Sequence, residues 1–155
     1  MGQPAPGSVT PTDSVVGPLV AQLALVAQQI QGIGICYLEP PEGPPEDNSV
    51  IFPCKSWEFV DSTNGRLRVY LTFDIMHLFS RRLLDEALPD IYKFTPAWWT
   101  VLGDWNNQTL GGLVRSMDVK AGEITTTKMA GEILLALTHR VRLLYEFPLT
   151  TAMLP

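Results

Sequence analysis

Few residues of this chain carry side chains suited to catalytic or metal chemistry. There are two cysteines, Cys36 and Cys54, and two histidines, His77 and His139. A zinc site takes about four nitrogen or sulfur ligands, and the two histidines are far apart in sequence. The cysteines fall on separate expected strands that could lie close in space. We interpret both as reduced residues that pack in the interior.

Carboxylates could act as general acids or bases, but their setting does not favour this. Asp85-Glu86 and Glu46-Asp47 are adjacent pairs next to prolines in apparent surface positions. A general acid needs burial or a like-charged neighbour to raise its pKa. His77 is the histidine nearest to acids, and the sequence holds no glycine-rich nucleotide motif, nucleophile elbow or paired metal-ligand motif. We therefore predict an interaction or assembly protein rather than an enzyme, with no catalytic residue, cofactor or metal.

Length and composition are those of an ordinary globular protein. The chain has 155 residues, 46% apolar and 17% charged, which fits one domain with a substantial core. It has no run of eighteen apolar residues, and its start lacks the basic and apolar regions of a signal peptide. Gly2 follows Met1, but Pro6 and Gly7 make the match to a myristoylation motif weak. We expect the protein to stay in the cytosol where it is made.

Residues 1–14 are rich in Pro, Gly, Ser and Thr and cannot form a packed element alone. We expect a flexible N-terminal tail, or an arm that orders only against a neighbouring subunit. A helix should follow, with Asp13 or Ser14 as its N-cap and Gly32 as its end. Its apolar residues recur at three- and four-residue steps on one face, namely Leu19, Leu23, Val26 and Ile30.

The next segments predict strands separated by a long loop. Residues 33–38 are a short strand candidate. Residues 39–49, EPPEGPPEDNS, hold four prolines and form either a solvated connection or a projecting recognition loop. Residues 50–60 and 66–76 flank Asn64-Gly65, which is the strongest hairpin signal in the chain. Pro53 indicates an edge or a bulge in the first arm.

The segment 77–105 predicts helical structure interrupted by proline. Residues 83–88 suggest one or two turns that stop at Pro89, and Thr95-Pro96 is a good N-cap and first-position pair for a second helix. If the chain kinks rather than breaks at Pro96, Ile91 and Phe94 extend the apolar stripe. We interpret the tryptophans as core and core edge, with a stacking platform for a sugar or nucleotide as the alternative. The stripe holds Trp98, Val101, Leu102 and Trp105, with Trp99 at its fringe.

The C-terminal third predicts three strands. Residues 113–120 and 123–129 form a hairpin about Ala121-Gly122, and a tight turn at Ala130-Gly131 leads into the final strand, Ala130–Phe147. We expect a central strand that extends past its sheet; a helix is the competing interpretation, since Leu and Ala favour helices. The predicted fold class is α+β, a mostly antiparallel β-sheet with helices packed on one face. One domain covers residues 15–148, followed by a tail over residues 149–155.

The order of these elements resembles a known family. An N-terminal helix, a strand, a proline- and acid-rich loop, a long hairpin and a tryptophan-bearing helix lead to the segment TLGGLV (Thr109–Val114). A long final strand then ends in an aromatic residue and proline. Over residues 15–148 this is similar to the tail terminator (tail-completion) proteins of long-tailed bacteriophages. The resemblance implies a virion structural protein whose hexameric ring caps the tail tube, stops its polymerisation and joins the tail to the head connector.

The resemblance also implies partners and location. The partners are copies of the same chain, the major tail tube protein and a head-completion or connector protein. Genomic DNA would pass through the ring without sequence-specific binding, which suits a net charge of −5 because non-specific DNA binding depends on basic patches. The expected location is the tail or neck of the virion, after assembly in the host cytoplasm and without a membrane.

Contact surfaces are expected where the chain is exposed: the arm, the proline-rich loop, the hairpin tip 61–65, the second half of the final strand and the tail. Charge reversal at Arg140 and Arg142 should damage assembly more than folding. The alternatives are another neck component, such as a head-completion (stopper) or minor tail protein, and a small-molecule-binding or hydrolytic domain that uses the Trp98/Trp99 region and His77. The expected interface residues are Glu39, Pro40, Pro41, Glu42, Pro44, Pro45, Glu46, Asp47, Asp61, Asn64, Arg140, Arg142, Glu146 and Phe147.

Overall fold

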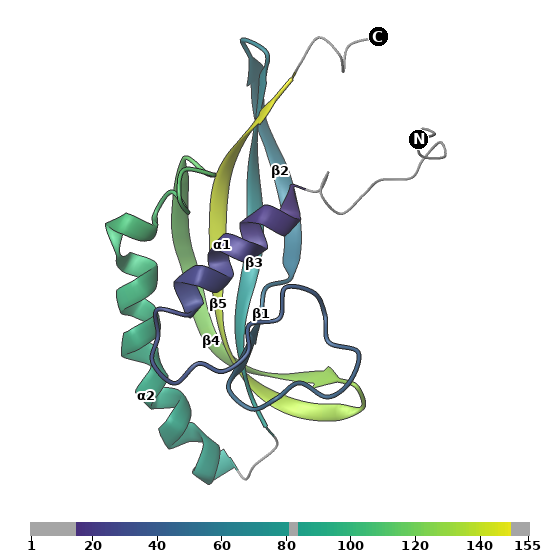
Figure 1. Ribbon diagram of the computed structural model, residues 1–155, viewed down its shortest axis with the longest axis vertical. Helices are drawn as coiled ribbons and strands as arrows, with labels where there is room; N and C mark the ends of the chain where they lie inside the picture. Colours follow the sequence, from purple (N-terminus) through teal and green to yellow (C-terminus); the bar gives the residue numbers. More distant parts are fainter. Residues whose placement is uncertain (1–14, 81–83, 150–155) are drawn as a thin grey trace, which may run out of the picture.

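The computed structural model describes residues 15–80 and 84–149 and confirms the predicted α+β class. The predicted arm over residues 1–14, with the N-caps Asp13 and Ser14, and the last six residues of the predicted tail lie outside the described residues. The elements, drawn in Figure 1, are α1 (Val16–Ala27), β1 (Ser49–Ile51), β2 (Cys54–Thr63), β3 (Arg66–Phe79), α2 (Leu84–Gly103), the short 3-10 helix η2 (Trp105–Asn107), β4 (Ser116–Met129) and β5 (Glu132–Pro148).

All five strands belong to one antiparallel sheet in which β5 lies between β3 and β4. The prediction of a central final strand is therefore confirmed. Its C-terminal end, however, does not extend alone. Pairing with β4 stops at Leu144, but β3 accompanies β5 up to Pro148 and β2 accompanies β3. The projection beyond the sheet is thus a three-stranded arm of β2, β3 and β5 (Figure 1).

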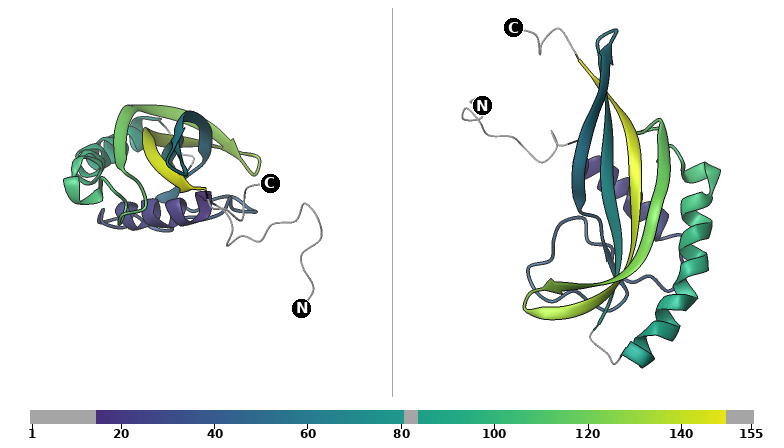
Figure 2. Two further views of the ribbon diagram at one scale, coloured as in Figure 1. Left: turned by 90° about the horizontal axis from the view of Figure 1, so that it is seen from above. Right: turned by 180° about the vertical axis from the view of Figure 1, so that it is seen from behind.

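One face of this sheet carries the hydrophobic core. The period-2 alternation of strands places Phe73, Ile75 and His77 of β3 beside Leu137 and Val141 of β5 on that face. Helix α1 crosses this face and α2 runs alongside β4, as Figure 2 shows from behind. Each of these five residues is at most 3% exposed, so the predicted apolar side of the final strand is buried from Leu137 to Leu143. At the start of β5 the prediction is wrong, because Ile133 is exposed and Leu134 and Ala136 of the other side are buried in a second, smaller cluster.

Helix α1 buries the predicted apolar residues but ends early. Leu19 and Leu23 are fully buried, and Val26 and Ile30 are nearly so. The helix itself stops at Ala27, and Gly32 takes a positive φ of 97° in the turn that follows. A left-handed residue that terminates the helical segment is the expected role of this glycine.

The first arm of the predicted hairpin is divided in two. The proline at position 53 has no N–H, and the chain leaves the ladder between β1 and β2 there, as predicted for an edge or bulge. The predicted strand 33–38 is wrong: the only pairing there is an isolated bridge from Cys36 to Val50. With only the three residues of β1 beside it, this segment has too short a partner to form a ladder. Both cysteines are free and partly buried, and burial raises the pKa of the Cys36 thiol.

The predicted helix start at Thr95-Pro96 is wrong, because α2 runs continuously through Pro89 and Pro96. Pro96 cannot donate to the carbonyl of Tyr92, the residue four positions before it. The Thr95 hydroxyl donates to that carbonyl instead, at 2.9 Å. Thr95 therefore replaces the missing backbone donor inside the helix and does not act as an N-cap. The alternative of a chain that passes through Pro96 is the correct one, with Ile91 fully buried on the stripe.

The predicted hairpin about Ala121-Gly122 is also wrong. Strand β4 passes through these residues without turning, with a register shift between Val119 and Ala121. A Cβ on Gly122 would lie 3.0 Å from Cδ2 of His139 on the neighbouring strand. The glycine thus permits a close side-chain approach inside a strand. The tight turn at Ala130-Gly131 is confirmed, with positive φ values of 50° and 81°.

Candidate assembly interface

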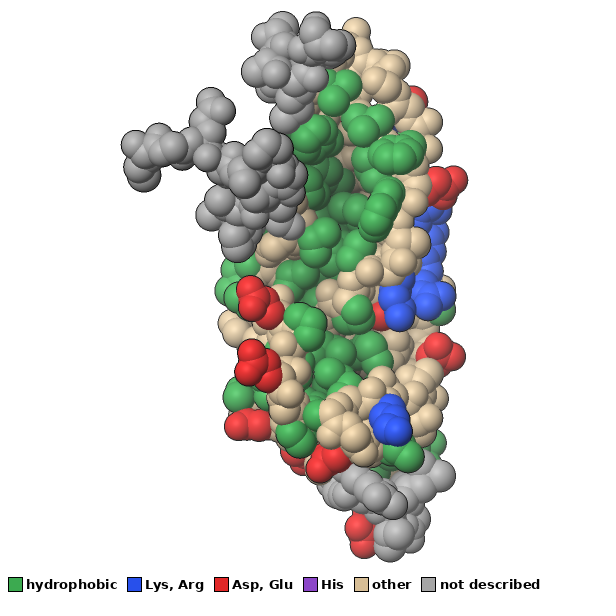
Figure 3. Space-filling view, turned by 90° about the vertical axis from the view of Figure 1, so that its right-hand side faces the viewer, with side chains coloured by type: hydrophobic (Ala, Val, Ile, Leu, Met, Phe, Trp, Pro, Cys, Tyr) green, Lys and Arg blue, Asp and Glu red, His purple; other side chains and the backbone are tan. Residues whose placement is uncertain are grey.

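An exposed apolar groove lies where the three-stranded arm leaves the core. It has a volume of about 270 Å³. The described residues that line it are all apolar or aromatic and come from the start of α1, β2, β3 and β5: Val15, Val16, Trp57, Phe59, Leu67, Val69, Leu71, Tyr145 and Phe147. In Figure 3 apolar side chains form a band along this side of the molecule. A contiguous apolar patch on a protein surface commonly marks a contact with another molecule.

The groove exists because the strand register places aromatic side chains on the helix-bearing face of the arm, where α1 does not cover them. Trp57 pairs with Leu71 and Phe59 with Val69, so both aromatic side chains lie on the helix-bearing face. Helix α1 begins only at Val16, at one side of the groove, and leaves these rings uncovered. Trp57 is 64% exposed and Phe59 63% exposed. Sequence reasoning missed both residues, because their alternation with Ser56 and Glu58 in β2 indicates a shared face but does not show that this face is exposed.

Charged residues lie on the opposite face of the same strands. The Arg140 guanidinium donates to Asp74 at 3.0 Å, and Asp74 is only 5% exposed. The Arg142 guanidinium stacks 3.6 Å from the centre of the Tyr70 ring. These two arginines therefore have partners within one subunit. Reversing the charge of Arg140 would place a carboxylate beside Asp74, so this substitution would affect folding as well as assembly.

The predicted hairpin residue Asp61 belongs to the same charged face. It forms an ion pair with Arg68, and the hydrogen bond from that guanidinium lowers the pKa of Asp61. Asn64 is exposed at the tip of the hairpin, where its φ is 51° and that of Gly65 is 74°. The predicted Asn-Gly turn is thus confirmed. The tip projects from the rest of the molecule with the three-stranded arm (Figure 1).

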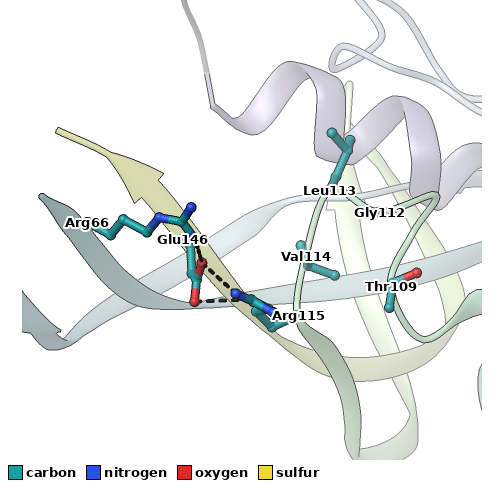
Figure 4. A pocket seen from close by; sticks show the side chains of 7 residues that line it. All are labelled: Arg66, Thr109, Gly112, Leu113, Val114, Arg115 and Glu146. Atoms are coloured by element: carbon teal, nitrogen blue, oxygen red, sulfur yellow. Dashed lines mark hydrogen bonds and ion pairs between the residues drawn. The ribbon is translucent and has the colours of Figure 1, made fainter. Parts of the chain in front are cut away.

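Glu146 lies at the base of the arm in a polar pocket of about 470 Å³. Its carboxylate accepts hydrogen bonds from Arg115 at 3.1 Å and from Arg66 at 2.9 Å (Figure 4). The bond from Arg115 is the main reason that the pKa of Glu146 is lowered. Because the carboxylate already occupies both guanidinium groups, this pocket is a structural clamp between β3, β5 and the start of β4. Phe147, the next residue, lines the apolar groove.

The proline-rich loop is exposed but anchored. The Asp47 carboxylate accepts from the backbone N–H of Ser80 at 2.8 Å, and the Glu46 N–H donates to the Tyr37 hydroxyl at 3.2 Å. Pro45 is buried and Pro41 half-buried. The remaining predicted contact residues of the loop, Glu39, Pro40, Glu42 and Pro44, are exposed. The loop can therefore present a fixed surface, and its role in contacts stays a prediction.

The two histidines lie in the core. Trp98 Nε1–H donates to His77 Nδ1 at 3.1 Å, and His77 Nε2 lies 3.2 Å from Asn48 Oδ1. Both His77 nitrogens thus bond neighbouring elements, which is a structural use of this side chain. Burial lowers the pKa of His77 and of His139 to about 4. Trp98 is fully buried as predicted, whereas Trp105, predicted on the same stripe, is 79% exposed because the chain leaves α2 at Gly103.

The described residues do not converge on a metal-ligand geometry. Within residues 15–80 and 84–149, no cluster of three or more His, Cys, Asp or Glu side chains is placed to hold a metal ion. Neither helix of that part of the chain combines the length and apolar character needed to cross a membrane. No protein-family model and no curated protein matches this chain.

Proposed function

We propose that this chain is a virion structural protein whose subunits form a hexameric ring on the end of a phage tail tube. The ring would stop tube polymerisation and join the tail to the head connector. The hexamer and these partners come from the resemblance in element order. The observation that carries the proposal is the uncovered apolar groove with Trp57 and Phe59, which a monomer leaves in water.

A ring requires contacts between two different surfaces of each subunit. Exposed apolar side chains lie at both edges of the sheet. Trp57 and Phe59 lie on β2 at one edge, and Trp99 and Val119 lie on α2 and β4 at the other. Such an arrangement supports head-to-tail association, in which the β2 edge of one subunit meets the β4 edge of the next.

The charge of the chain also supports the proposal. A net charge of −5 gives little attraction to DNA phosphates, so DNA could pass through a ring of this protein without being retained. Arginines on the charged face pair with acids within the subunit: Arg140 with Asp74, and Arg66 and Arg115 with Glu146. None of these three arginines needs a phosphate to satisfy its charge.

The test is to mix the purified protein with growing tail tubes and examine them by negative-stain electron microscopy. We expect six-fold rings on one end of each tube and an arrest of tube elongation. A head-completion (stopper) protein would instead bind head connectors and leave tubes free to grow. A protein that binds neither, over a range of concentrations, would refute a role in the neck. The hydrolytic alternative gains no support from His77, since both of its ring nitrogens are engaged.

A further inference from the structure

A second apolar hollow lies between α2 and β4, at the edge of the sheet opposite β2. This cleft has a volume of about 520 Å³. Its exposed walls are Trp99, at 64% exposure, Val119, at 42%, and Ile124, at 37%. A cleft of this size with mostly apolar walls can take an aromatic side chain. Its lining also includes Gly122 and His139.

The floor of the cleft is opened by a glycine. A Cβ at position 122 would lie 3.0 Å from Cδ2 and 3.2 Å from Nε2 of His139, so a larger residue there would crowd this edge of the imidazole. The bulge between Val119 and Ala121 lies beside it. Bulges re-aim side chains and are common next to binding sites. His139 is 2% exposed, and its Nδ1 has no hydrogen-bond partner among the described residues.

The chemistry of the floor suits an uncharged aromatic ring. Burial lowers the pKa of His139 to about 4, so the imidazole is neutral at physiological pH. The Cδ2–Nε2 edge of His139 faces Gly122, and this edge of a neutral imidazole can meet the face of an aromatic ring, while Trp99 can stack against that ring from the side. Lys120 and Glu123 at the rim carry opposite charges. The cleft therefore does not attract an ion of either sign.

We propose that the Trp57 side chain of one subunit inserts into this cleft of a neighbouring copy, between Trp99 and Gly122. This inference rests on the proposed ring and names its contact. Trp57 is the largest exposed side chain on the β2 edge, and the cleft lies on the β4 edge, so the two surfaces lie at opposite edges of the sheet in one subunit. The pairing is head-to-tail and can close a ring.

The positions of Trp57 and the cleft along the strand direction constrain the geometry of the ring. Trp57 lies opposite Leu71 of β3, whereas Gly122 lies opposite His139, whose β3 partner is Ile75. The two surfaces are therefore four residues apart along β3, or about 13 Å at the usual rise per residue. In a closed ring all subunits have the same height, so the strands must be inclined to the ring axis.

Complementary variants test the contact directly. Trp57→Ala removes the inserted side chain and keeps the cleft, and Trp99→Ala removes a cleft wall and keeps the inserted side chain. Each variant alone should lose self-association by about 30-fold or more in dissociation constant, the effect of a central aromatic contact. An equimolar mixture has one intact contact, so it should give heterodimers in sedimentation velocity but no rings. Trp105→Ala removes an indole that is 79% exposed and lies outside the cleft, and it should associate like the wild type.

The outcomes separate this contact from the function of the ring. Three results would overturn the contact. The mixture could stay monomeric where the wild type associates, or either single variant could associate like the wild type. The wild type could also stay monomeric at 10-fold the concentration at which it caps tubes. If these results occur while the wild type still caps tubes, the proposed function stands and the contact is wrong. If heterodimers form but the wild type does not cap tubes, the contact stands and the function is wrong. Circular dichroism of each variant excludes unfolding as the cause.

Discussion

Acid should destabilise this protein well above the pH at which its carboxylates titrate, because two histidines are buried without charge. His77 is fully buried and His139 is 2% exposed, and burial lowers the pKa of each from 6.5 to about 4. A lowered histidine pKa means that, between pH 4 and 6.5, the unfolded state binds more protons than the folded state. The stabilisation is therefore complete above pH 6.5 and is lost as the pH falls from 6.5 towards 4.

The magnitude follows from these two pKa values. At pH 5 an unfolded histidine is about 97% protonated, whereas a histidine with a folded pKa near 4 is about 9% protonated. Each histidine then contributes a loss of about 2 kcal/mol relative to pH 7.5, or about 4 kcal/mol for the pair. That is a large part of the stability of a typical domain. The lowered pKa values of Asp61 and Glu146 act mainly below pH 4.5, at the acid end of this window and beneath it.

Urea unfolding followed by circular dichroism at pH 7.5, 6.0 and 5.0 measures the effect. His139→Leu should remove about half of the loss between pH 7.5 and 5.0, with little change at pH 7.5, because Nδ1 of His139 has no described hydrogen-bond partner. His77→Leu should also halve the loss but should lower stability at every pH, since it breaks the bonds to Trp98 and Asn48. A wild-type free energy of unfolding that changes by less than about 0.5 kcal/mol over this range would refute the reasoning.

Two further predictions concern local devices of the fold. Thr95→Val should destabilise the protein by about 1 kcal/mol, because the Tyr92 carbonyl loses the donor that replaces Pro96. Thr100→Val should have a smaller effect in the same urea titration, because its hydroxyl bonds a carbonyl inside a continuous part of the helix. Gly65→Ala should cost about 1–2 kcal/mol at its positive φ. Gly43→Ala, with no atom within 4 Å of the added Cβ, should change the unfolding midpoint little; equal effects of the two alanines would contradict the turn argument.

The sheet could be predicted from the sequence because its strands alternate. Leu67 to Ile75 in β3 and Leu135 to Leu143 in β5 repeat with period 2, and that pattern alone determines which face is buried. The Asn64-Gly65 turn fixes the register of the β2–β3 hairpin. The class, the central position of β5 and the one-sided placement of the helices therefore follow from local rules.

The helix and the groove could not be predicted in this way, because both depend on distant residues. Pro96 by itself disfavours a continuous helix, but the Thr95 hydroxyl bonds the Tyr92 carbonyl and Trp98 is buried against His77, a residue distant in sequence. Likewise, the exposure of Trp57 depends on where α1 begins relative to β2. An aromatic residue in an alternating strand predicts burial unless the covering helix is known to be too short.

Gly122 is the position where the turn predicted from the local sequence is absent and where its absence shapes the cleft. Ala-Gly between two strand-like segments predicts a turn, yet β4 continues and the glycine faces the His139 ring. A glycine inside a strand weakens it, so its presence needs a reason that the strand itself does not supply. Departures from local rules concentrate at functional or strained sites. The bulge, the glycine and the Cδ2–Nε2 edge of the His139 ring meet at one cleft, and a strand that only completed the sheet would need neither the bulge nor the glycine.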